Sequence, residues 1–142
     1  MNTLQAGFAR VNVTPMLGIG LAGYFQKRIS DGVLDELEIN ALALSCGEDR
    51  VVLLSVDHLG MEQKITTKFR ERISEVTGVS MEGIYLHCTH THTAPYLNDQ
   101  AEDDLQKALY DVSAKLYQQA APQEGCDPNC GGNCANEGPM DA

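Results

Sequence analysis

Two histidines lie one residue apart in the run Thr89-His90-Thr91-His92-Thr93. In extended backbone, side chains two residues apart project to the same side, roughly 6–7 Å from one another. Neutral imidazole is a common zinc ligand, so the two rings can share one metal, or one can bind it while the other polarises a substrate. The same pattern also fits two ordinary surface histidines, so the spacing alone leaves both roles open.

Other polar residues lie close to this motif in the sequence. Asp57 and His58 follow an apolar run, and His87 precedes the histidine motif. Asp57 fits two roles, a carboxylate that orients a metal-bound histidine or a cap for the helix that follows. We expect the His87 side chain to point away from His90. There it either packs against neighbouring side chains or orients a residue of the site. We expect His58 to be structural.

Three cysteines near the end of the chain form a C-x₃-C-x₃-C pattern, Cys126, Cys130 and Cys134. Thiolates bind soft metals, but structural metal sites use tighter pairs and four ligands. The surrounding residues are mostly Gly, Asn and acidic types. The pattern therefore favours adventitious metal binding or no role over a built metal centre.

Hydrophobic periodicity predicts the elements that position these residues. Period-two or continuous apolar runs predict strands over 7–14, 37–45, 51–56 and 84–88. The third run is apolar on both faces, as in a strand covered on both sides. Between the last two strands, Ile65, Phe69, Ile73 and Val76 have helical spacing, and Gly78 is placed to end that helix.

This order predicts an α/β fold, a small mixed sheet with a right-handed βαβ unit, followed by one helix and a disordered tail. Strands joined by a helical crossover run parallel, and ligands bind beyond the carboxyl ends of parallel strands. The polar groups after residues 56 and 88 should therefore meet at one sheet edge. We place an α/β domain at 1–97, a junction at 98–103, a helix at 104–121 and the tail at 122–142.

Composition restricts the class of protein. The chain has 142 residues with 10 basic and 20 acidic side chains, a formal charge of −10. An acidic chain is a poor partner for nucleic-acid phosphates. No apolar run is long enough for a transmembrane helix, and the first residues lack a signal-peptide pattern. With an odd number of cysteines, five, we expect a reducing, cytoplasmic setting; the oligomeric state stays open.

Four segments together resemble the N-terminal part of the neutral/alkaline non-lysosomal ceramidase family, over about residues 4–97. They are AGFARVNVTPMLGIGLAGY (6–24), SDGVLDELEINALAL (30–44), RVVLLSVDHLG (50–60) and IYLHCTHTHTAP (84–95). The resemblance implies a zinc-dependent amidohydrolase that cleaves the N-acyl bond of ceramide, a lipid amide. By the family's motif, His90 would bind zinc and His92 would lie beside the reacting carbonyl.

The sequence departs from that family at several places. Thr93-Ala94-Pro95 replaces Ser-Gly-Pro, and Leu34 replaces a histidine found in many members. The family's remaining zinc ligands, another His, a Glu and a Tyr, have no counterpart in matching context here. Because catalytic zinc sites have three or more protein ligands, we expect weak zinc binding and little or no hydrolysis by the isolated chain.

Residues 104–125 resemble a different family, the C-terminal lid helix and tail of a DnaK-type chaperone. Leu105, Leu109, Val112 and Leu116 have helical spacing there. Two further hypotheses follow from this second part of the chain. One is a non-catalytic, chaperone-derived interaction fragment, and the other is a small metal-binding protein that uses the tail cysteines.

Overall fold

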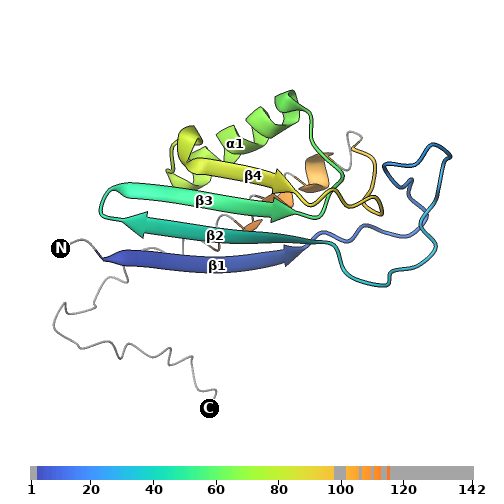
Figure 1. Ribbon diagram of the computed structural model, residues 1–142, viewed down its shortest axis with the longest axis horizontal. Coiled ribbons are helices and arrows are strands. Elements are labelled where there is room, and N and C mark those ends of the chain that lie inside the picture. The colour runs from blue at the N-terminus through green and yellow to red at the C-terminus, as the bar shows by residue number, and fades with distance from the viewer. Residues whose placement is uncertain (1–2, 98–101, 106, 110, 113–114, 116–142) are drawn as a thin grey trace, which may run out of the picture.

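A four-stranded mixed sheet forms the body of the protein (Figure 1). The computed structural model describes residues 3–97, 102–105, 107–109, 111–112 and 115. The sheet has the order β1-β2-β3-β4, antiparallel in its first two pairings and parallel between β3 and β4. The strands are β1 (Leu4–Asn12), β2 (Glu38–Cys46), β3 (Asp49–Val56) and β4 (Ile84–Cys88). The predicted fold class, α/β with a mixed sheet, is therefore confirmed.

The strand boundaries follow local chemistry. β1 ends at Asn12 rather than at Thr14, because the Asn12 side chain accepts a hydrogen bond from the Thr14 backbone N–H at 2.7 Å. Asparagine that bonds the backbone two residues on makes a turn that competes with the strand. Gly47 adopts a positive φ of 64° in the turn between β2 and β3, a conformation that glycine reaches without a steric penalty.

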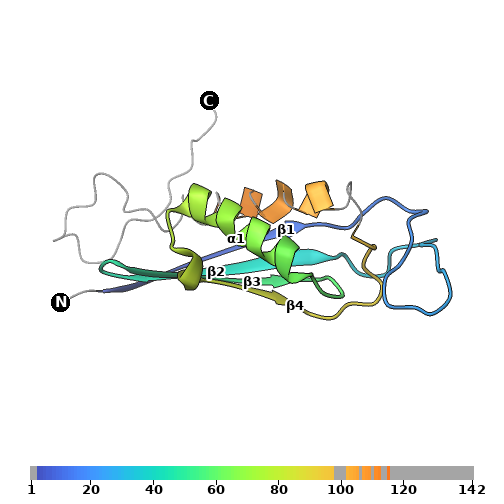
Figure 2. The same cartoon turned by 90° about the horizontal axis from the view of Figure 1, so that it is seen from above.

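Both helical segments cover the same face of the sheet (Figure 2). Helix α1 (Gln63–Thr77) buries Phe69 and Ile73 and ends at Gly78, whose left-handed conformation lets its N–H reach Ser74 O. This confirms the helix and the terminator that the periodicity predicts. A short 3₁₀ turn, η1 (Met81–Gly83), leads into β4.

The described residues of the 102–115 segment are helical. Leu105, Leu109 and Val112 are buried there, at the positions that the periodicity predicts, while Leu116 lies outside the described residues. The Lys68 ammonium of α1 lies 2.7 Å from the Glu102 carboxylate. The two helical segments and the inner sheet face share one core with Ile39, Leu54 and Val56. Each such side chain contributes about 1.5–3 kcal/mol when it leaves water.

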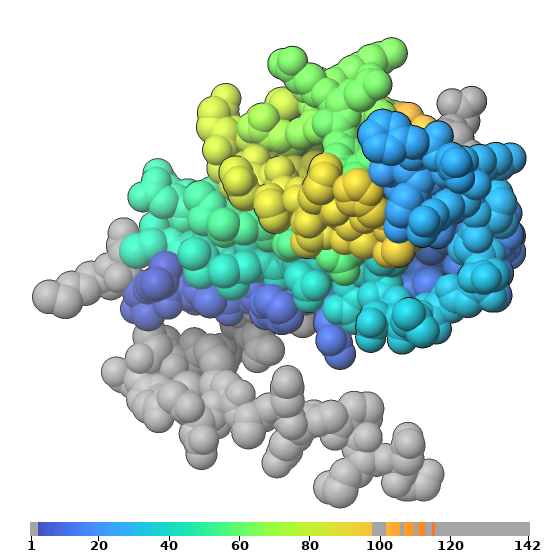
Figure 3. All heavy atoms as spheres, turned by 45° about the vertical axis from the view of Figure 1, so that its right-hand side comes forward, coloured from blue at the N-terminus to red at the C-terminus, as the bar shows by residue number. Residues whose placement is uncertain are grey.

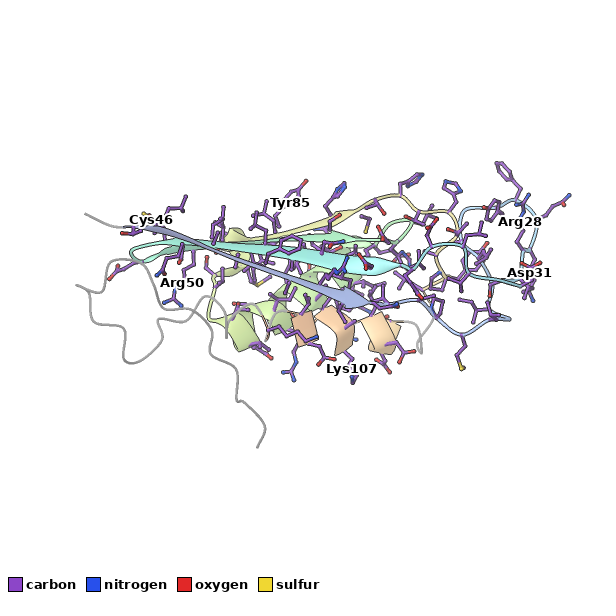
Figure 4. The ribbon with its side chains drawn as sticks, turned by 90° about the horizontal axis from the view of Figure 1, so that it is seen from below. Arg28, Asp31, Cys46, Arg50, Tyr85 and Lys107 are labelled. Carbon is purple, nitrogen blue, oxygen red and sulfur yellow. The ribbon has the colours of Figure 1, made fainter. Side chains whose placement is uncertain are left out.

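The opposite face of the sheet, which we call the outer face, is open in the described part of the chain. Phe8, Leu42, Leu53 and Tyr85 lie side by side across it by register, and Phe8 and Tyr85 are 60% and 62% exposed. Figure 4 shows Tyr85 on the side away from the helices. The expectation that β3 is covered on both faces is therefore wrong for the described residues, because only one helical layer is present.

The described residues include no helix with the length and apolar character that crossing a membrane requires.

Candidate functional site

The carboxyl ends of β3 and β4 meet at one edge of the sheet. The register places Val56 beside Cys88, and the pairing continues beyond the strands. Thr89 N–H donates to Val56 O at 3.0 Å, and Thr91 N–H donates to His58 O at 3.1 Å. The predicted juxtaposition of the two polar segments is therefore observed, and it follows from the parallel crossover.

His90 has an unusual backbone conformation. Its φ is 64°, and it is the one non-glycine residue with positive φ in the described part of the chain. Such a conformation costs free energy for a side chain with Cβ, and it concentrates at functional sites. The His90 ring is held by a 2.8 Å contact between Nδ1 and Leu59 O. Because a carbonyl oxygen can only accept, Nδ1 carries the proton and Nε2 is left with its lone pair.

The ring of His92 is also held by a backbone carbonyl, in this case that of Gly23. Its Nδ1 lies 3.0 Å from Gly23 O, so Nδ1 again donates and Nε2 again presents a lone pair. Gly23 has φ +81°, and a Cβ built there would lie 2.3 Å from His92 Nδ1. Only glycine therefore allows the backbone to approach the ring this closely.

The loop between β1 and β2 brings Gly23 to the histidines. Ala22 N–H donates to Ala94 O at 2.9 Å, and Tyr96 N–H donates to Gly20 O at 3.2 Å. Figure 3 shows this loop, in blue, lying against the gold segment that carries residues 89–97. The glycine-rich composition predicts a long irregular loop, but it does not indicate that the loop docks on the histidine motif.

The two imidazoles converge on one point. His90 Nε2 and His92 Nε2 lie 3.3 Å apart, and the ring centroids are 4.9 Å apart at an interplanar angle of 81°. The expectation of extended backbone through the motif is wrong, because His90 has a left-handed backbone conformation. Two lone pairs at this distance repel unless a proton or a cation lies between them. Two nitrogens bound to one tetrahedral zinc at 2.0–2.1 Å would be about 3.3–3.4 Å apart, so the pair fits that metal.

Two side chains that the sequence pattern does not single out, Tyr24 and Arg28, lie near the histidine pair. The Tyr24 ring lies edge-on to His92 at 5.8 Å, and the Arg28 guanidinium lies over the Tyr24 ring at 4.2 Å from its centroid. The Tyr24 ring is thus the neighbour of His92 in this stack, and Arg28 contacts Tyr24. Nothing in the sequence pattern around Tyr24 and Arg28 signals this role, because the contact depends on how the loop folds back.

Asp57 supports the histidine segment indirectly. Its carboxylate accepts from Glu38 N–H at 3.0 Å and from the Thr89 hydroxyl at 3.0 Å, and the Thr89 and Thr91 hydroxyls are 2.7 Å apart. The alternative that Asp57 caps a helix is wrong, since the residue before α1 is Glu62. Asp57 therefore braces the threonines that flank His90.

His87 and Cys88 take no direct part in the histidine pair. His87 is exposed and shares the outer face with Tyr85, two residues before it on β4. Cys88 is half-buried, and burial raises the pKa of its thiol. Strand alternation places His87 on the outer face and Cys88 on the inner one, and the expectation that His87 points away from His90 stays a prediction.

His58 lies in a different environment from the pair. It is 4% exposed, and its Nδ1 lies 3.2 Å from Gly60 O. Burial lowers the pKa of His58, while the backbone carbonyls of Gly60 and Pro95 oppose this effect. The ring is therefore neutral near pH 7, in keeping with the structural role that we expect for it.

The described residues contain no group of three or more His, Cys, Asp or Glu side chains arranged to hold a metal. The pair of His90 and His92 could supply two ligands, and a group of three or more is not found in that part of the chain. Cys126, Cys130 and Cys134 lie outside the described residues, so the tail hypothesis stays a prediction.

The structure is thus a mixed α/β fold in which polar side chains gather at the carboxyl edge of a parallel strand pair. Among solved structures, a ceramidase complexed with C2 is similar to it, with a TM-score of 0.70 and 17% sequence identity. The match covers 84% of this chain and 22% of the ceramidase chain, so this chain spans about a fifth of that protein's length. At this identity the likeness concerns the fold. No protein-family model and no curated protein matches the sequence.

Proposed function

We propose that this chain carries part of a zinc-dependent amidohydrolase site that acts on N-acyl amide bonds. The observation that carries the proposal is the convergence of His90 Nε2 and His92 Nε2 to 3.3 Å, with both Nδ1 atoms held by backbone carbonyls. The ceramidase-like fold supports the reaction class. A sphingolipid amide is the substrate that this likeness favours, and a cytoplasmic setting is part of the same proposal.

His90 is the first zinc ligand in this proposal. Its Nδ1–H is fixed by Leu59 O, and a hydrogen bond of this kind sets the tautomer and orientation of a metal-binding histidine. The positive φ of His90 aims Nε2 away from the strand and toward His92. Bound zinc would lower the pKa of a coordinated water and polarise the substrate carbonyl.

His92 lies beside the reacting groups in this proposal. Because Gly23 O holds its Nδ1 proton, Nε2 is the atom that can accept a proton from water, and it can return that proton to the leaving amine. His92 can also serve as a second zinc ligand, since the 3.3 Å spacing fits both uses. The edge contact of Tyr24 with the His92 ring supports this orientation.

The site provides fewer ligands than a catalytic zinc centre needs. With two imidazoles in the described residues and three or more protein ligands usual for zinc, the isolated chain should bind zinc weakly. We expect little or no amide hydrolysis by this chain alone. Binding rather than turnover is therefore the property to measure first.

The experiment measures zinc affinity by equilibrium dialysis or calorimetry in the wild type and in three single variants. We expect His90→Ala to lose zinc binding, His92→Ala to weaken it at least tenfold, and His87→Ala to change nothing, since His87 faces the outer side. A Cys126→Ser/Cys130→Ser/Cys134→Ser variant separates binding by the tail. Unchanged zinc affinity in His90→Ala would contradict the proposal.

A hydrolysis assay with a short-chain N-acyl sphingosine analogue completes the test. Turnover that depends on zinc and on His92 would extend the proposal to a competent enzyme. Zinc binding with no turnover would agree with a partial site. Metal that is lost only in the triple serine variant would favour the tail-cysteine hypothesis instead.

A further inference from the structure

The histidine pair lies at the surface of the molecule. His90 and His92 are both exposed, and the loop and the gold segment that hold their rings lie side by side at the surface in Figure 3. The carbonyls of Leu59 and Gly23 contact the two Nδ1 atoms, so the Nε2 atoms, 3.3 Å apart, are the ones that face each other. An ion held between them can therefore be reached by ligands from outside the chain.

Zinc in proteins is most often bound by four ligands in a tetrahedron. The pair can supply two nitrogens, and the described residues contain no group of three or more metal-binding side chains. Water molecules can fill the remaining positions one at a time, whereas a second pair arranged in advance brings two nitrogens in one binding event. Because the second nitrogen then binds at high effective concentration, another pair of histidines is the favoured source of ligands.

A second copy of this chain carries such a pair in the same conformation. The left-handed backbone of His90 and the two carbonyl contacts arrange the rings before a metal binds, so association needs little further ordering at the site. Two-fold dimers, the commonest homo-oligomers, bring the same patch of both copies together. Two such patches provide four imidazole nitrogens.

The surface beside the pair suits contact between two copies of an acidic chain. The chain has a formal charge of −10, yet residues 15–30 and 84–97, which include the pair and its neighbour Tyr24, contain no Asp or Glu. Because like charges oppose association, a contact made through these segments avoids much of that repulsion. The same segments carry exposed aromatic rings, since Phe25 is fully exposed and Tyr96 is 47% exposed. A dimer contact here therefore covers apolar surface as well as the metal.

We propose that two copies of this chain share one zinc ion, bound by His90 and His92 of each copy, and thereby form a metal-dependent homodimer. This inference rests on the proposed zinc site and adds the source of its further ligands. A zinc site with four protein ligands is closed, whereas a catalytic site keeps one position for water or substrate. The shared site is therefore a non-hydrolytic state of the pair, in keeping with the little or no hydrolysis that we expect from this chain.

The test is sedimentation velocity of the full chain, with zinc added stepwise under reducing conditions and bound zinc measured in the same samples. We expect a monomer without zinc, a dimer that saturates at one zinc ion for every two chains, and a return to monomer when EDTA removes the metal. The apparent zinc affinity should rise with protein concentration, because dimer formation and metal binding are linked.

Single variants show which surface forms the contact, with circular dichroism to check that each is folded. His90→Ala and His92→Ala should each abolish the zinc-dependent dimer. His87→Ala, which removes an exposed histidine of the outer face, should leave it unchanged. Phe25→Ser should weaken dimer formation about fivefold or more while the zinc ligands stay intact. Phe8→Ser, which removes an exposed phenylalanine of the outer face, is its matched control and should have no effect.

The outcomes separate this proposal from the zinc site on which it rests. One zinc ion bound by the histidine pair of each monomeric chain would overturn the shared site and leave the proposed function standing. No zinc binding would overturn both. A dimer that persists in EDTA, that is lost in Phe8→Ser, or that is lost in the Cys126→Ser/Cys130→Ser/Cys134→Ser variant would also overturn the shared site, because the contact would then lie elsewhere.

Discussion

The histidine pair and His58 place imidazoles at the same sheet edge in opposite surroundings. His90 and His92 are exposed, and backbone carbonyls hold their Nδ1 atoms while their Nε2 atoms face one another. His58 is buried, and its Nδ1 contacts the backbone of Gly60. The difference shows that exposure and backbone partners, more than residue type, determine which imidazoles are placed to bind a metal.

The largest effect that we expect is a loss of stability in a core variant. It tests whether the histidine pair depends on the packing of the core. Leu109 is 1% exposed and packs in the shared core, so Leu109→Ala should lower the free energy of unfolding by about 2–5 kcal/mol. Urea unfolding measures this loss. Zinc affinity of the folded variant should stay near the wild-type value, because Leu109 belongs to the core and not to the pair.

The control for this variant is Lys107→Ala, two residues earlier on the exposed side, which should change stability by no more than about 0.5 kcal/mol. Equal destabilisation by both variants would show that the helical segment does not pack as described.

Gly23→Ala should disturb the pair while sparing His58. The added Cβ would lie 2.3 Å from His92 Nδ1, so the ring must move and lose its anchor on Gly23 O. Loss of a hydrogen bond that orients a ligand typically costs about 10–100-fold in metal affinity, and zinc titration measures it.

Gly18→Ala is the matched control for this change. Gly18 also has a positive φ, +89°, but nothing lies within 4 Å of a Cβ placed there. Both variants carry similar backbone strain, so only Gly23→Ala should weaken zinc binding. A parallel loss in Gly18→Ala would assign the effect to strain in the loop.

His58 should give the protein an acid-dependent stability. Burial lowers its pKa from the ordinary 6.5, so the unfolded chain binds a proton more readily than the folded one. Stability is then full above about pH 6.5 and falls as the pH drops toward the lowered folded pKa, by up to about 1.4 kcal/mol per pH unit.

Urea unfolding between pH 7.5 and pH 5 measures this slope, which should be smaller in His58→Gln. The same measurement on His87→Gln serves as the reference, since that histidine is exposed. A slope unaffected by His58→Gln would place the acid sensitivity elsewhere.

We expect the smallest changes in stability and zinc affinity from substitution of the threonines that flank His90. Thr89→Val removes the hydrogen bond to Asp57 and the contact with Thr91, which should cost about 0.5–1.5 kcal/mol of stability and less than tenfold in zinc affinity. Thr93→Val, at the exposed end of the same run, is the control. Zinc affinity that falls more in Thr93→Val than in Thr89→Val would refute the bracing role of Asp57.

Sequence patterns predict the elements of this fold more fully than its site. The spacing of Phe69 and Ile73 and the position of Gly78 predict α1, because burial and helix ending depend on nearby residues. The positive φ of His90 and the contact of Gly23 with His92 are not predictable in this way. They depend on a loop that folds back across the sheet edge, and no local pattern records which carbonyl meets which ring.

In the part of the chain that the structure describes, the outer face exposes large apolar side chains to water. Sulfate and phosphate strengthen apolar association by being excluded from protein surfaces, so this side should make the chain salt out early. Dilute, low-salt buffers should keep the molecules dispersed despite Phe8 and Tyr85.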